Sequence, residues 1–450
     1  MDLQNAFQAF VREEKLFFPG DKLLLAVSGG LDSVVLTELC VRLGYSLVIA
    51  HCNFGLRGAA SERDEQFVAG LAGRYGQEYR VKHFDTMAYA AAHKLSVQVA
   101  ARDLRYTWFA ELLAAEKQDV RTGNPPEAIL TAHHLDDNIE TMLMHFFRGT
   151  GISGMRGMLP RQGSILRPLL FASKAELAEF AAAAGLSWVE DESNSTDKYT
   201  RNYWRHHLVP QVRKLYPAAE QNLAANLRRF RDTEVLYRQA VDQQLKKLLY
   251  ASGDEMQVPV ARLMQAEPLH TICYELISGY GFTADQVPEL IRLAGSETGK
   301  FIRSASHRII KNRRWFIIAP LHEESVGHYA VEKEEKQLRF DRGMLVLKLM
   351  PHNGDTVNAE RDTGLLDADL LSFPLLWRRW KQGDYFYPLG MKKKKKLARF
   401  LIDAKLSATE KENTWVLVSG AHIVWVGGRR IDERFRVTAQ TRNVFRVTLK

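Results

Sequence analysis

The chain has 450 residues, about three times the usual length of a domain, so two or three separately folded units are expected. With 46% apolar and 26% charged residues, the composition excludes wholesale disorder. The 62 Lys and Arg outnumber the 53 Asp and Glu and give a formal charge of +9. This balance suits an anionic partner such as nucleic acid, although proteins that bind no nucleic acid also carry so small an excess.

The spacing of the cysteines and the hydropathy of the chain argue against several further classes of protein. Cys40, Cys52 and Cys273 have no C-x-x-C spacing, so a zinc knuckle, a redox pair or a sulfur-transfer centre is not expected. The first residues lack the pattern of a signal peptide, and no run of about 18 apolar residues occurs. We therefore expect a cytoplasmic protein that neither enters nor crosses a membrane.

The N-terminal part of the chain has the pattern of an α/β domain. Between residues 23 and 132, short apolar runs alternate with stretches of helical period, as in a parallel sheet covered by helices on both faces. Strands are expected at 23–27, 47–51, 79–83 and 128–132, and helices at 33–43, 59–75 and 97–116. We expect this domain to span residues 1–216.

Two further domains are expected. Residues 218–250 predict one long basic helix that leads into a mainly helical domain at 217–325, with strands near Arg308 and at 315–319. A smaller β-rich α+β domain is expected at 345–450. Its last strands are expected at 414–419, 423–427 and 444–449.

The clearest motif, S-G-G-L-D-S, joins the first expected strand to the first helix. Its glycines let successive backbone N–H groups converge, and the helix N-terminus adds partial positive charge, so the motif favours an anion. A carboxylate beside that anion requires a cation, for which Mg2+ is expected. The sequence matches neither a Walker loop nor a dinucleotide motif, and an ordinary turn with a helix cap is the alternative. The motif consists of Ser28, Gly29, Gly30, Leu31, Asp32 and Ser33.

Two other segments support a nucleotide site. H-C-N-F-G-L-R-G at 51–58 follows the second expected strand, at the carboxyl edge of the sheet where ligands bind, although a histidine there is more often structural. In A-R-D-L-R-Y, Arg102, Arg105 and Tyr106 project from one side of an expected helix. The two guanidinium groups could clamp phosphates or simply be solvated.

The segment A-H-H-L-D-D-N-I-E-T follows the fourth expected strand and predicts the first turns of a helix. His133, Asp137 and Glu140 fall on one face, as metal ligation and proton transfer require, with His134 and Asp136 at its edge. Zinc is the competing metal, but H-E-x-x-H is absent from the sequence and oxygen ligands favour magnesium. An acidic cap at a helix N-terminus is the simpler alternative.

The motifs together carry a family resemblance. The glycine loop resembles that of N-type ATP pyrophosphatases, which cleave ATP to AMP and pyrophosphate. In their order along the chain, the four segments resemble those of tRNA(Ile)-lysidine synthetases. The resemblance continues nearly to the C-terminus, through R-G-T-G at 148–151, R-P-L-L at 167–170, D-E-S-N at 191–194, R-N at 201–202, Arg205, W-R-R-W-K-Q-G-D-Y-F-Y-P-L-G-M and F-L-I-D-A-K.

The resemblance implies a two-step ligation on RNA. ATP adenylates the ring carbonyl oxygen of the wobble cytidine in the CAU anticodon of tRNA(Ile), and free L-lysine then displaces AMP to give lysidine. The implied cofactors are ATP and Mg2+, and the implied partners are tRNA(Ile) and free L-lysine. The sequence does not determine the oligomeric state, and a homodimer stays open.

The same resemblance implies roles for residues. ATP binding is implied for the six residues of the glycine loop, and Asp32 and Asp137 are the implied metal ligands. Glu140 would join them in holding magnesium or the lysine ammonium group. Catalytic roles are implied for His133, Asp137, Glu140, Arg102 and Arg105. Phe54 stands where many family members have histidine, so that histidine's role cannot be carried over.

Contacts to tRNA are expected at two places. Arg201 and Arg205, four apart on an expected helix, would face the RNA or the reacting base, and a structural ion pair is the equal alternative. The run at 392–396 is self-repelling unless it is solvated or faces phosphates. In this run, tRNA contacts are expected at Lys392, Lys393 and Lys394.

Two other functions stay open. A tRNA thiolase would adenylate a base and then deliver sulfur, but such an enzyme needs a cysteine pair or cluster that this sequence does not offer. A noncatalytic tRNA-binding protein could keep the fold without the activity. Pyrophosphate release that depends on both ATP and tRNA would separate the enzymes from the binding protein.

Overall fold

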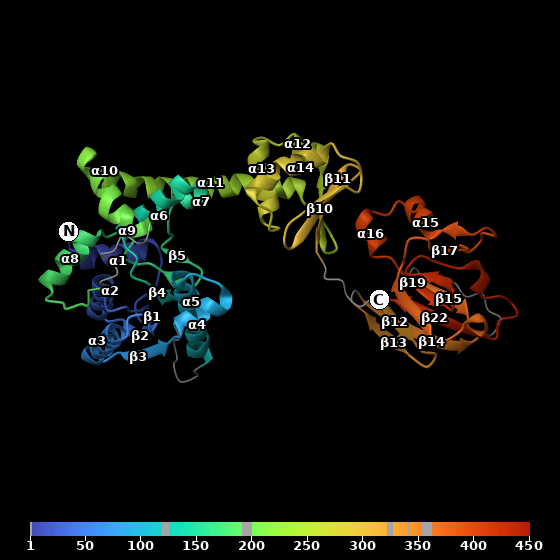
Figure 1. Ribbon diagram of the computed structural model, residues 1–450, viewed down its shortest axis with the longest axis horizontal. Coiled ribbons are helices and arrows are strands. Elements are labelled where there is room, and N and C mark those ends of the chain that lie inside the picture. The colour runs from blue at the N-terminus through green and yellow to red at the C-terminus, as the bar shows by residue number, and fades with distance from the viewer. Residues whose placement is uncertain (1, 119–125, 191–199, 322–326, 341–342, 353–361) are drawn as a thin grey trace. The chain divides into compact units, whose positions relative to one another are not determined.

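The structure is a computed structural model that describes residues 2–118, 126–190, 200–321, 327–340, 343–352 and 362–450. The chain divides into two compact units, Met1–Arg238 and Gln239–Lys450. Figure 1 labels their helices and strands from the N-terminus in blue to the C-terminus in red. Among the described residues, no helix is both long and apolar enough to span a bilayer.

The first unit is built on a six-stranded sheet of order β3-β2-β1-β4-β6-β5, in which only the β5–β6 pair is antiparallel. Its strands are β1 (Lys22–Ala26), β2 (Ser46–Asn53), β3 (Glu78–His83), β4 (Ile129–Leu130), β5 (Arg161–Gln162) and β6 (Ile165–Leu166). The four expected strands overlap β1 to β4, and the predicted α/β class with a parallel sheet is confirmed.

Helices cover both faces of this sheet (Figure 1). The helices of this unit are α1 (Leu3–Glu13), α2 (Leu31–Arg42), α3 (Ala59–Tyr75), α4 (Thr86–His93), α5 (Val97–Gln118), α6 (Leu135–Arg148), α7 (Ile152–Met155), α8 (Lys174–Ala183), α9 (Thr200–Tyr203), the π-helical turn η2 (Trp204–Leu208), α10 (Val209–Leu215) and α11 (Ala219–Leu248). Helix α11 is the long basic helix that the sequence predicts, and it continues into the second unit.

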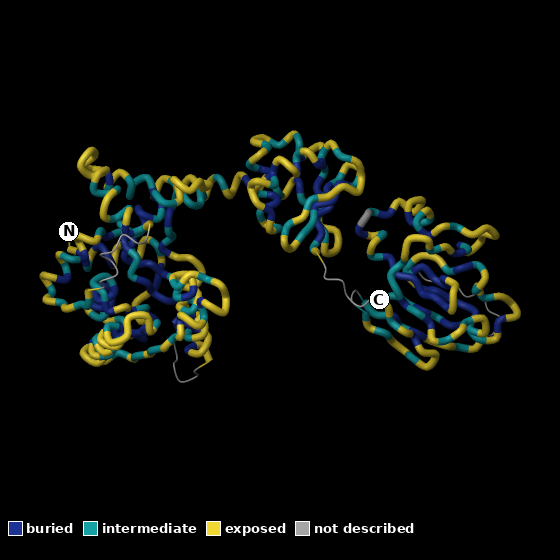
Figure 2. The backbone as a smooth tube through the Cα atoms, in the orientation of Figure 1, coloured by how far each residue is buried: buried dark blue, intermediate teal, exposed yellow. Residues whose placement is uncertain are grey.

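The three leucines of strand β1 show why the strand is apolar after Lys22. Leu23 and Leu25 pack in one buried cluster with residues of α1, α2 and α8, whereas Leu24 packs in another with Trp108 of α5. Because successive side chains of a strand point to opposite faces, a strand covered on both faces has no position for a polar residue. Each fully buried leucine contributes about 1.5–3 kcal/mol of transfer free energy. Figure 2 shows the sheet as the buried centre of the unit.

The first part of the second unit combines helices with an antiparallel five-stranded sheet of order β7-β8-β11-β10-β9. The strands expected near Arg308 and at 315–319 are β10 and β11, whereas β7, β8 and β9 were not expected. Strands β7 and β9 have three residues each and are mostly exposed, so they carry no periodic apolar signal. The elements are β7 (Tyr250–Ser252), β8 (Glu255–Pro259), α12 (Val260–Met264), α13 (Leu269–Ser278), η3 (Ala284–Gln286), α14 (Val287–Ala294), β9 (Phe301–Arg303), β10 (His307–Asn312) and β11 (Trp315–Pro320).

The C-terminal part of this unit contains two antiparallel sheets, of orders β12-β16-β19-β20-β21 and β13-β14-β22-β15. Their facing sides share one core, in which Trp377 stacks on Trp415 and Trp425 with ring centroids 5.7 and 5.8 Å apart. The expected β-rich α+β character is confirmed, and the strands expected at 414–419, 423–427 and 444–449 are β19, β20 and β22.

The elements of this part, in chain order, are β12 (His328–Val331), β13 (Gln337–Phe340), β14 (Gly343–Pro351), β15 (Thr363–Asp367), η4 (Ala368–Leu370), β16 (Leu375–Arg379), β17 (Tyr385–Phe386), β18 (Lys395–Lys396), α15 (Leu397–Asp403), α16 (Ala408–Glu412), β19 (Trp415–Ser419), β20 (His422–Val426), β21 (Arg430–Ile431), η5 (Glu433–Phe435) and β22 (Asn443–Leu449).

Candidate active site

The S-G-G-L-D-S loop lies between the end of β1 and the start of α2, as predicted. Gly29 has a φ of +92°, and a Cβ there would lie 3.4 Å from both Phe67 and Val68, so a larger residue would be strained. The Ser33 hydroxyl accepts from the Gly29 N–H at 3.2 Å and donates to the Gly30 carbonyl at 2.8 Å. No side chain among the described residues caps the N-terminus of α2, whose first N–H groups are therefore open to an anion.

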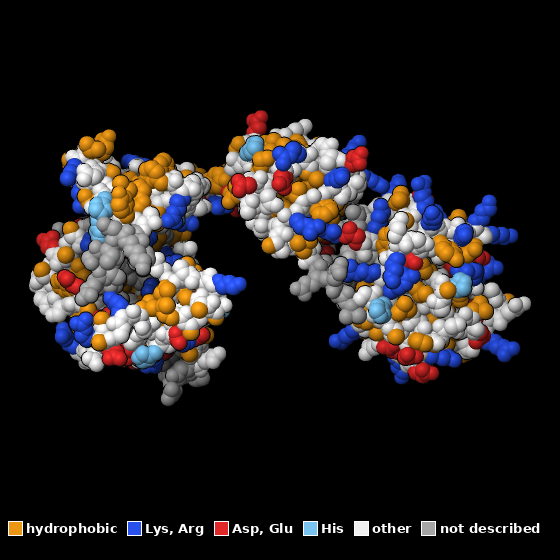
Figure 3. All heavy atoms as spheres, viewed as in Figure 1, with side chains coloured by type: hydrophobic (Ala, Val, Ile, Leu, Met, Phe, Trp, Pro, Cys, Tyr) orange, Lys and Arg blue, Asp and Glu red, His pale blue; other side chains and the backbone are white. Residues whose placement is uncertain are grey.

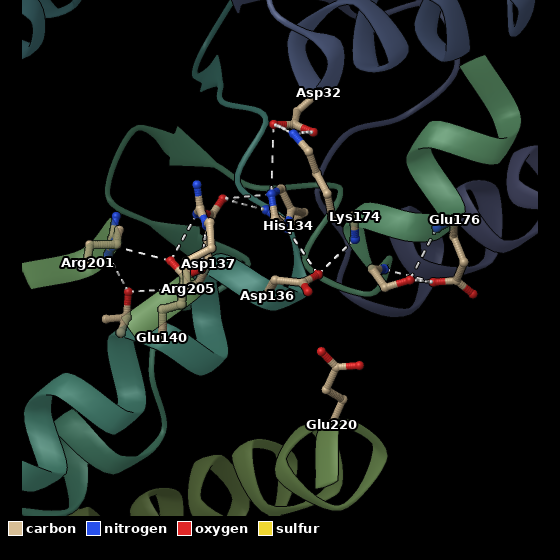
Figure 4. Close-up of polar contacts among 12 residues, drawn as sticks. Asp32, His134, Asp136, Asp137, Glu140, Lys174, Glu176, Arg201, Arg205 and Glu220 are labelled. Atoms are coloured by element: carbon tan, nitrogen blue, oxygen red, sulfur yellow. Dashed lines mark hydrogen bonds and ion pairs between the residues drawn. The ribbon is translucent and has the colours of Figure 1, made fainter. Parts of the chain in front are cut away.

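Charged side chains from three helices meet beside this loop (Figure 4). Asp32, in the first turn of α2, pairs with the Lys174 Nζ at 2.7 Å, and Lys174 is the first residue of α8. The backbone N–H of Lys174 donates at 2.8 Å to the carboxylate of Asp136, in the first turn of α6. The N-terminal turns of α2, α6 and α8 thus come together, and their partial positive charges favour an anion at this place.

His134 lies among three aspartates of this cluster. Its side chain is 3% exposed, with Nε2 3.8 Å from Asp32 and 3.4 Å from Asp137, and with Nδ1 3.4 Å from Asp136. Burial alone would lower the pKa of this imidazole, but Asp136, then Asp137 and Asp32, raise the pKa above its ordinary value. The contact to Asp136 is too poorly aligned for a hydrogen bond, so we attribute its effect to charge. The three carboxylates therefore favour the protonated form of His134.

We expect the raised pKa of His134 to make the free energy of unfolding depend on pH. Because the pKa of His134 is raised in the folded protein, its stabilisation is complete below the unfolded pKa of about 6.5 and is lost as pH rises through the folded pKa. The free energy of unfolding, measured by urea denaturation without metal or nucleotide, should fall over this range. In His134→Gln the fall should disappear, and parallel curves for the two proteins above about pH 6.5 would contradict the assignment.

His133 has the opposite electrostatic environment. Burial lowers the pKa of His133 to about 4, against the raising effect of Asp137. Three arginines reinforce the lowering: Arg167, Arg201 and Arg105. The Nδ1 atom of His133 lies 2.9 Å from the Thr131 hydroxyl. The pKa values of these two adjacent histidines are therefore shifted in opposite directions, and His133 is neutral at neutral pH.

Arg205 pairs with two carboxylates of the cluster, those of Asp137 and Glu140. Glu140 is 3% exposed, and Arg205 donates to its two oxygens at 2.7 and 3.0 Å and to Asp137 at 3.0 Å. Burial raises the pKa of Glu140 even though Arg205 opposes the rise. Arg201 donates to the Thr141 hydroxyl at 2.7 Å and approaches Glu140 to 3.6 Å. Both arginines thus pair with the predicted catalytic face, and their contact with tRNA stays a prediction.

A turn of π-helix carries Arg205. Helix α9, η2 and α10 follow one another without a break, and Pro210 lies at the start of α10. A proline has no N–H to donate, and its ring clashes with the carbonyl group four residues earlier, here that of His206. The helix widens over this turn, as helices often do at functional sites.

Arg102 and Arg105 occupy exposed positions on α5, and each lies over an aromatic ring. The Arg105 guanidinium is 5.2 Å from the Phe54 ring centroid, and that of Arg102 is 4.9 Å from the centroid of Tyr106. Arg105 contributes to the lowered pKa of His133, so this part of α5 faces the neutral histidine. Within the described ranges, neither arginine reaches the acidic cluster at ion-pair distance.

The residue that replaces the family histidine belongs to an aromatic pair. Phe54 stacks on Phe84 with ring centroids 5.5 Å apart. Together with Gly55, Thr86 and Met87 they line an open cavity of about 390 Å³ at the carboxyl edge of the sheet. The cavity has the flat, partly apolar lining that a purine ring requires.

The predicted lysine contacts belong to the second unit, whereas all other predicted site residues belong to the first. Lys392, Lys393 and Lys394 are exposed, and the Lys394 Nζ lies 5.3 Å from the ring centroid of Tyr385. Lys395 instead pairs with Asp403 at 2.9 Å. The run therefore divides into an exposed part and a part anchored by pairing of β18 with β17.

Sequence reasoning missed Lys174 and undervalued His134. Lys174 follows Ser173 in a capping box with Glu176, which marks a helix start but does not indicate that the ammonium group faces Asp32, 142 residues away. The sequence placed His134 only at the edge of the predicted face, because helical periodicity was expected from His133 onward. The helix begins only at Leu135, and the extended backbone of its N-cap, His134, turns the side chain inward.

The cysteines bear on the thiolase alternative. All three lie in the described part of the chain and are free thiols. Burial raises the pKa of the Cys40 thiol, raises that of Cys52 to about 12 and raises that of Cys273 to about 11. Because sulfur transfer requires a thiolate, these raised pKa values argue against a thiolase.

Family models match the chain in three segments. A PP-loop domain model matches residues 1–212, a TilS substrate binding domain model matches 251–321, and a TilS substrate C-terminal domain model matches 375–448.

Full-length relatives are also found. The tRNA(Ile)-lysidine synthase of Parabacteroides distasonis is 36% identical, and that of Bacteroides thetaiotaomicron is 34% identical. Each alignment covers 98% of both chains. Among solved structures, the U34-tRNA thiolase of Methanococcus maripaludis with its 4Fe-4S cluster is 16% identical and covers 50% of this chain and 78% of that chain. Its TM-score of 0.41 is too low to bear on function.

Proposed function

The chain belongs to the tRNA(Ile)-lysidine synthase family, and from this premise we propose that it joins free L-lysine to the wobble cytidine of tRNA(Ile) bearing the CAU anticodon. ATP adenylates the ring carbonyl oxygen, and lysine then displaces AMP to form lysidine. The chain is thus an ATP-dependent ligase that forms a carbon–nitrogen bond. Both the thiolase and the noncatalytic binding protein are disfavoured by full-length similarity to ligases and by the intact charged cluster.

The observation that carries the proposal is the meeting of three helix N-termini at the glycine loop, directly beside a buried acidic cluster. The helix N-termini suit the phosphates of ATP, and the six loop residues from Ser28 to Ser33 would bind them. The cluster of Asp137 and Glu140 suits a cationic substrate such as the lysine ammonium group. This ligation requires a group of residues that suits an anion beside one that suits a cation.

In the first step, the cytosine carbonyl oxygen attacks the α-phosphorus, and the bond from that phosphorus to the bridging oxygen of the β-phosphate breaks. Pyrophosphate leaves with this bonding pair, and the N–H groups and hydroxyls of the loop stabilise its charge. His133 is neutral because of its low pKa, so it can accept a hydrogen bond in the adenylation site without adding charge. Arg105, and Arg102 one helical turn before it, would spread the charge that develops on the phosphate.

In the second step, the lysine ε-ammonium loses a proton and its amine attacks the ring carbon, after which the carbon–oxygen bond to AMP breaks. Asp137 and Glu140 would hold the ammonium group before the proton is lost. That proton would pass to solvent water, and His133, a weak base because burial lowers its pKa to about 4, would accept only a hydrogen bond from the amine. Arg205 pairs with both Asp137 and Glu140 and so balances one of their two negative charges. The other negative charge would balance the ammonium group.

Magnesium fits the residues that the site offers. Within the described ranges, no group of three His, Cys, Asp or Glu side chains could hold a metal ion by itself. Mg2+ is commonly bound by one or two carboxylates together with substrate phosphates, and Asp32 and Asp137 both approach the same atom, the Nε2 of His134, at 3.8 and 3.4 Å. These two aspartates would hold the ion, which would neutralise charge on the phosphates of ATP.

Each of the three domains proposed from the sequence would have its own role in the reaction. Residues 1–216 form the catalytic domain, and residues 217–325 and 345–450 bind tRNA in this proposal. The matched segments at 251–321 and 375–448, both described as TilS substrate domains, support that division. Three free thiols and a tRNA substrate suit the cytoplasm. A homodimer remains part of the proposal to be tested by sedimentation.

The direct test is incorporation of radiolabelled lysine into a CAU-anticodon tRNA(Ile) transcript with ATP and magnesium. A transcript with uridine at the wobble position is the matched control. Label in the cytidine transcript alone establishes the reaction and its target. AMP formation without label would move the second substrate away from lysine, and absence of both products would overturn the proposal.

The lysine run makes a separate prediction about tRNA affinity. Replacing Lys392, Lys393 and Lys394 with glutamine should weaken tRNA binding and flatten its salt dependence, by about 0.9 in the logarithmic slope for each lost duplex phosphate contact. Filter binding at several salt concentrations measures both quantities. Lys395→Gln is a useful contrast, because Lys395 already pairs with Asp403. An unchanged slope in the triple variant would exclude these contacts.

A further inference from the structure

A group of aromatic side chains stands exposed on the first unit, close to the acidic cluster. We call it the aromatic platform and define it as Phe146 and Phe147 at the end of α6, Tyr203 in α9 and Trp204 in η2. Phe146, Phe147 and Tyr203 are 58%, 69% and 50% exposed. The ring centroids of Phe147 and Trp204 lie 5.1 Å apart, and those of Phe146 and Phe147 lie 5.4 Å apart. Rings gathered at the surface in this way mark a binding surface.

Basic side chains predominate in the segment that carries Tyr203 and Trp204, although three of them are paired: Arg201 and Arg205 with Glu140 and Arg213 with Glu220. Residues 200–216 contain four basic residues, Arg201, Arg205, Arg213 and Lys214, and no Asp or Glu. Helix α6 ends in Arg148 directly after Phe147. In Figure 3, hydrophobic, histidine and basic side chains lie together over the part of the first unit that Figure 1 labels α6, α9 and α10. Exposed rings among cations are the combination that binds single-stranded nucleic acid.

The platform continues directly from the acidic cluster. Trp204 precedes Arg205, whose guanidinium holds Glu140 and Asp137. Phe147 lies seven residues after Glu140 on α6, on the same side of the helix and roughly 10 Å farther along it at 1.5 Å per residue. Stacked nucleotides rise by about 3.4 Å each, so this span corresponds to roughly three nucleotides. A strand with one base at the acidic cluster would therefore lay its neighbouring bases on the rings.

We propose that the aromatic platform stacks unpaired anticodon-loop bases that flank the reacting cytidine. The identity of the RNA rests on the proposed function, whereas the stacking itself does not require catalysis. A paired stem cannot use the rings in this way because its bases already stack on one another. Arg148, which directly follows Phe147, would hold a phosphate of the same strand and so help to fix the reacting base at the acidic cluster.

The test uses an RNA hairpin with the CAU loop and 2-aminopurine beside the cytidine. Wild-type protein should quench its fluorescence on binding. Phe147→Ala and Trp204→Ala should each raise the Kd about tenfold and lose the quenching, because each removes one stacking ring. Phe147→Tyr and Trp204→Phe keep a ring and should stay within about twofold of wild type. Because Trp204 is half-buried, Phe147→Ala decides the result if Trp204→Ala does not fold.

Phe18→Ala is the matched control. Phe18 is 63% exposed and precedes the amino end of β1, at the opposite edge of the sheet from the site, so its loss should leave the Kd unchanged. An unchanged Kd in Phe147→Ala would overturn the proposal. An equal loss of affinity for a paired RNA without a loop would also overturn it, because it would indicate phosphate contacts alone. So would a dimer that Phe147→Ala dissociates without change in RNA affinity, since a second copy of the chain would then cover the rings.

The two experiments distinguish failure of this proposal from failure of the proposed ligase function. Wild-type protein that quenches the probe through Phe147 but incorporates no lysine would keep the platform and remove the ligase activity. Protein that incorporates lysine with an unchanged Kd in Phe147→Ala would keep the ligase activity and remove the platform.

Discussion

Asp137→Asn should lower pyrophosphate release that depends on ATP and tRNA by about a thousandfold, the upper range for removing one electrostatic group from an active site, while tRNA affinity stays within about twofold. Asp137 lies 3.4 Å from the His134 imidazole and accepts from Arg205 at 3.0 Å. The cationic groups around it lower its pKa despite burial, so it is ionised at neutral pH. The amide keeps the shape of the side chain and removes only the charge that the metal ion and the lysine ammonium would use.

The measurement pairs an enzymatic assay with a binding assay. Pyrophosphate release reports adenylation, and filter binding reports tRNA affinity in the same preparations. Asp103→Asn removes an exposed aspartate from α5 and should change neither quantity. Equal losses of adenylation and of tRNA binding in Asp137→Asn would refute a local chemical role for this carboxylate.

The second large effect is expected at Arg205. Arg205→Met would leave Glu140, which is 3% exposed, without its main counter-ion. Breaking a buried ion pair by removing one partner costs about 3–5 kcal/mol, and we expect the lower end, about 3 kcal/mol, because the Arg205 side chain is 34% exposed. Thermal and urea unfolding would measure this loss. Adenylation should fall as well, because Asp137 loses the same partner.

A double variant separates stability from catalysis at this pair. Arg205→Met combined with Glu140→Gln removes both charges, so most of the lost stability should return. Activity should not return, because both groups belong to the proposed site. Recovery of pyrophosphate release in the stable double variant would show that the pair is structural, which the sequence left as the equal alternative for Arg205.

Prediction from sequence succeeded where the physical cause is local. The continuous apolar runs predicted buried strands because β1 is covered on both faces, and the glycine loop was recognisable because a strand, two glycines and a helix follow one another in the chain. Family membership was also readable from motif order, and the full-length relatives confirm it. The roles assigned to single residues remain predictions.

Only the tertiary structure decided which charged side chains pair across long separations in the chain and in which direction the pKa values of buried groups shift. The sequence by itself determined the α/β fold, the family and the segments from which a site would be drawn. It could not tell that Lys174 faces Asp32 or that Arg205 holds Glu140, 65 residues away, because side-chain types do not encode which distant elements pack together. Nor could it separate His133 from His134. Their opposite pKa shifts arise only after folding: burial lowers the pKa of His133 with help from three arginines, whereas carboxylates outweigh burial at His134 and raise its pKa.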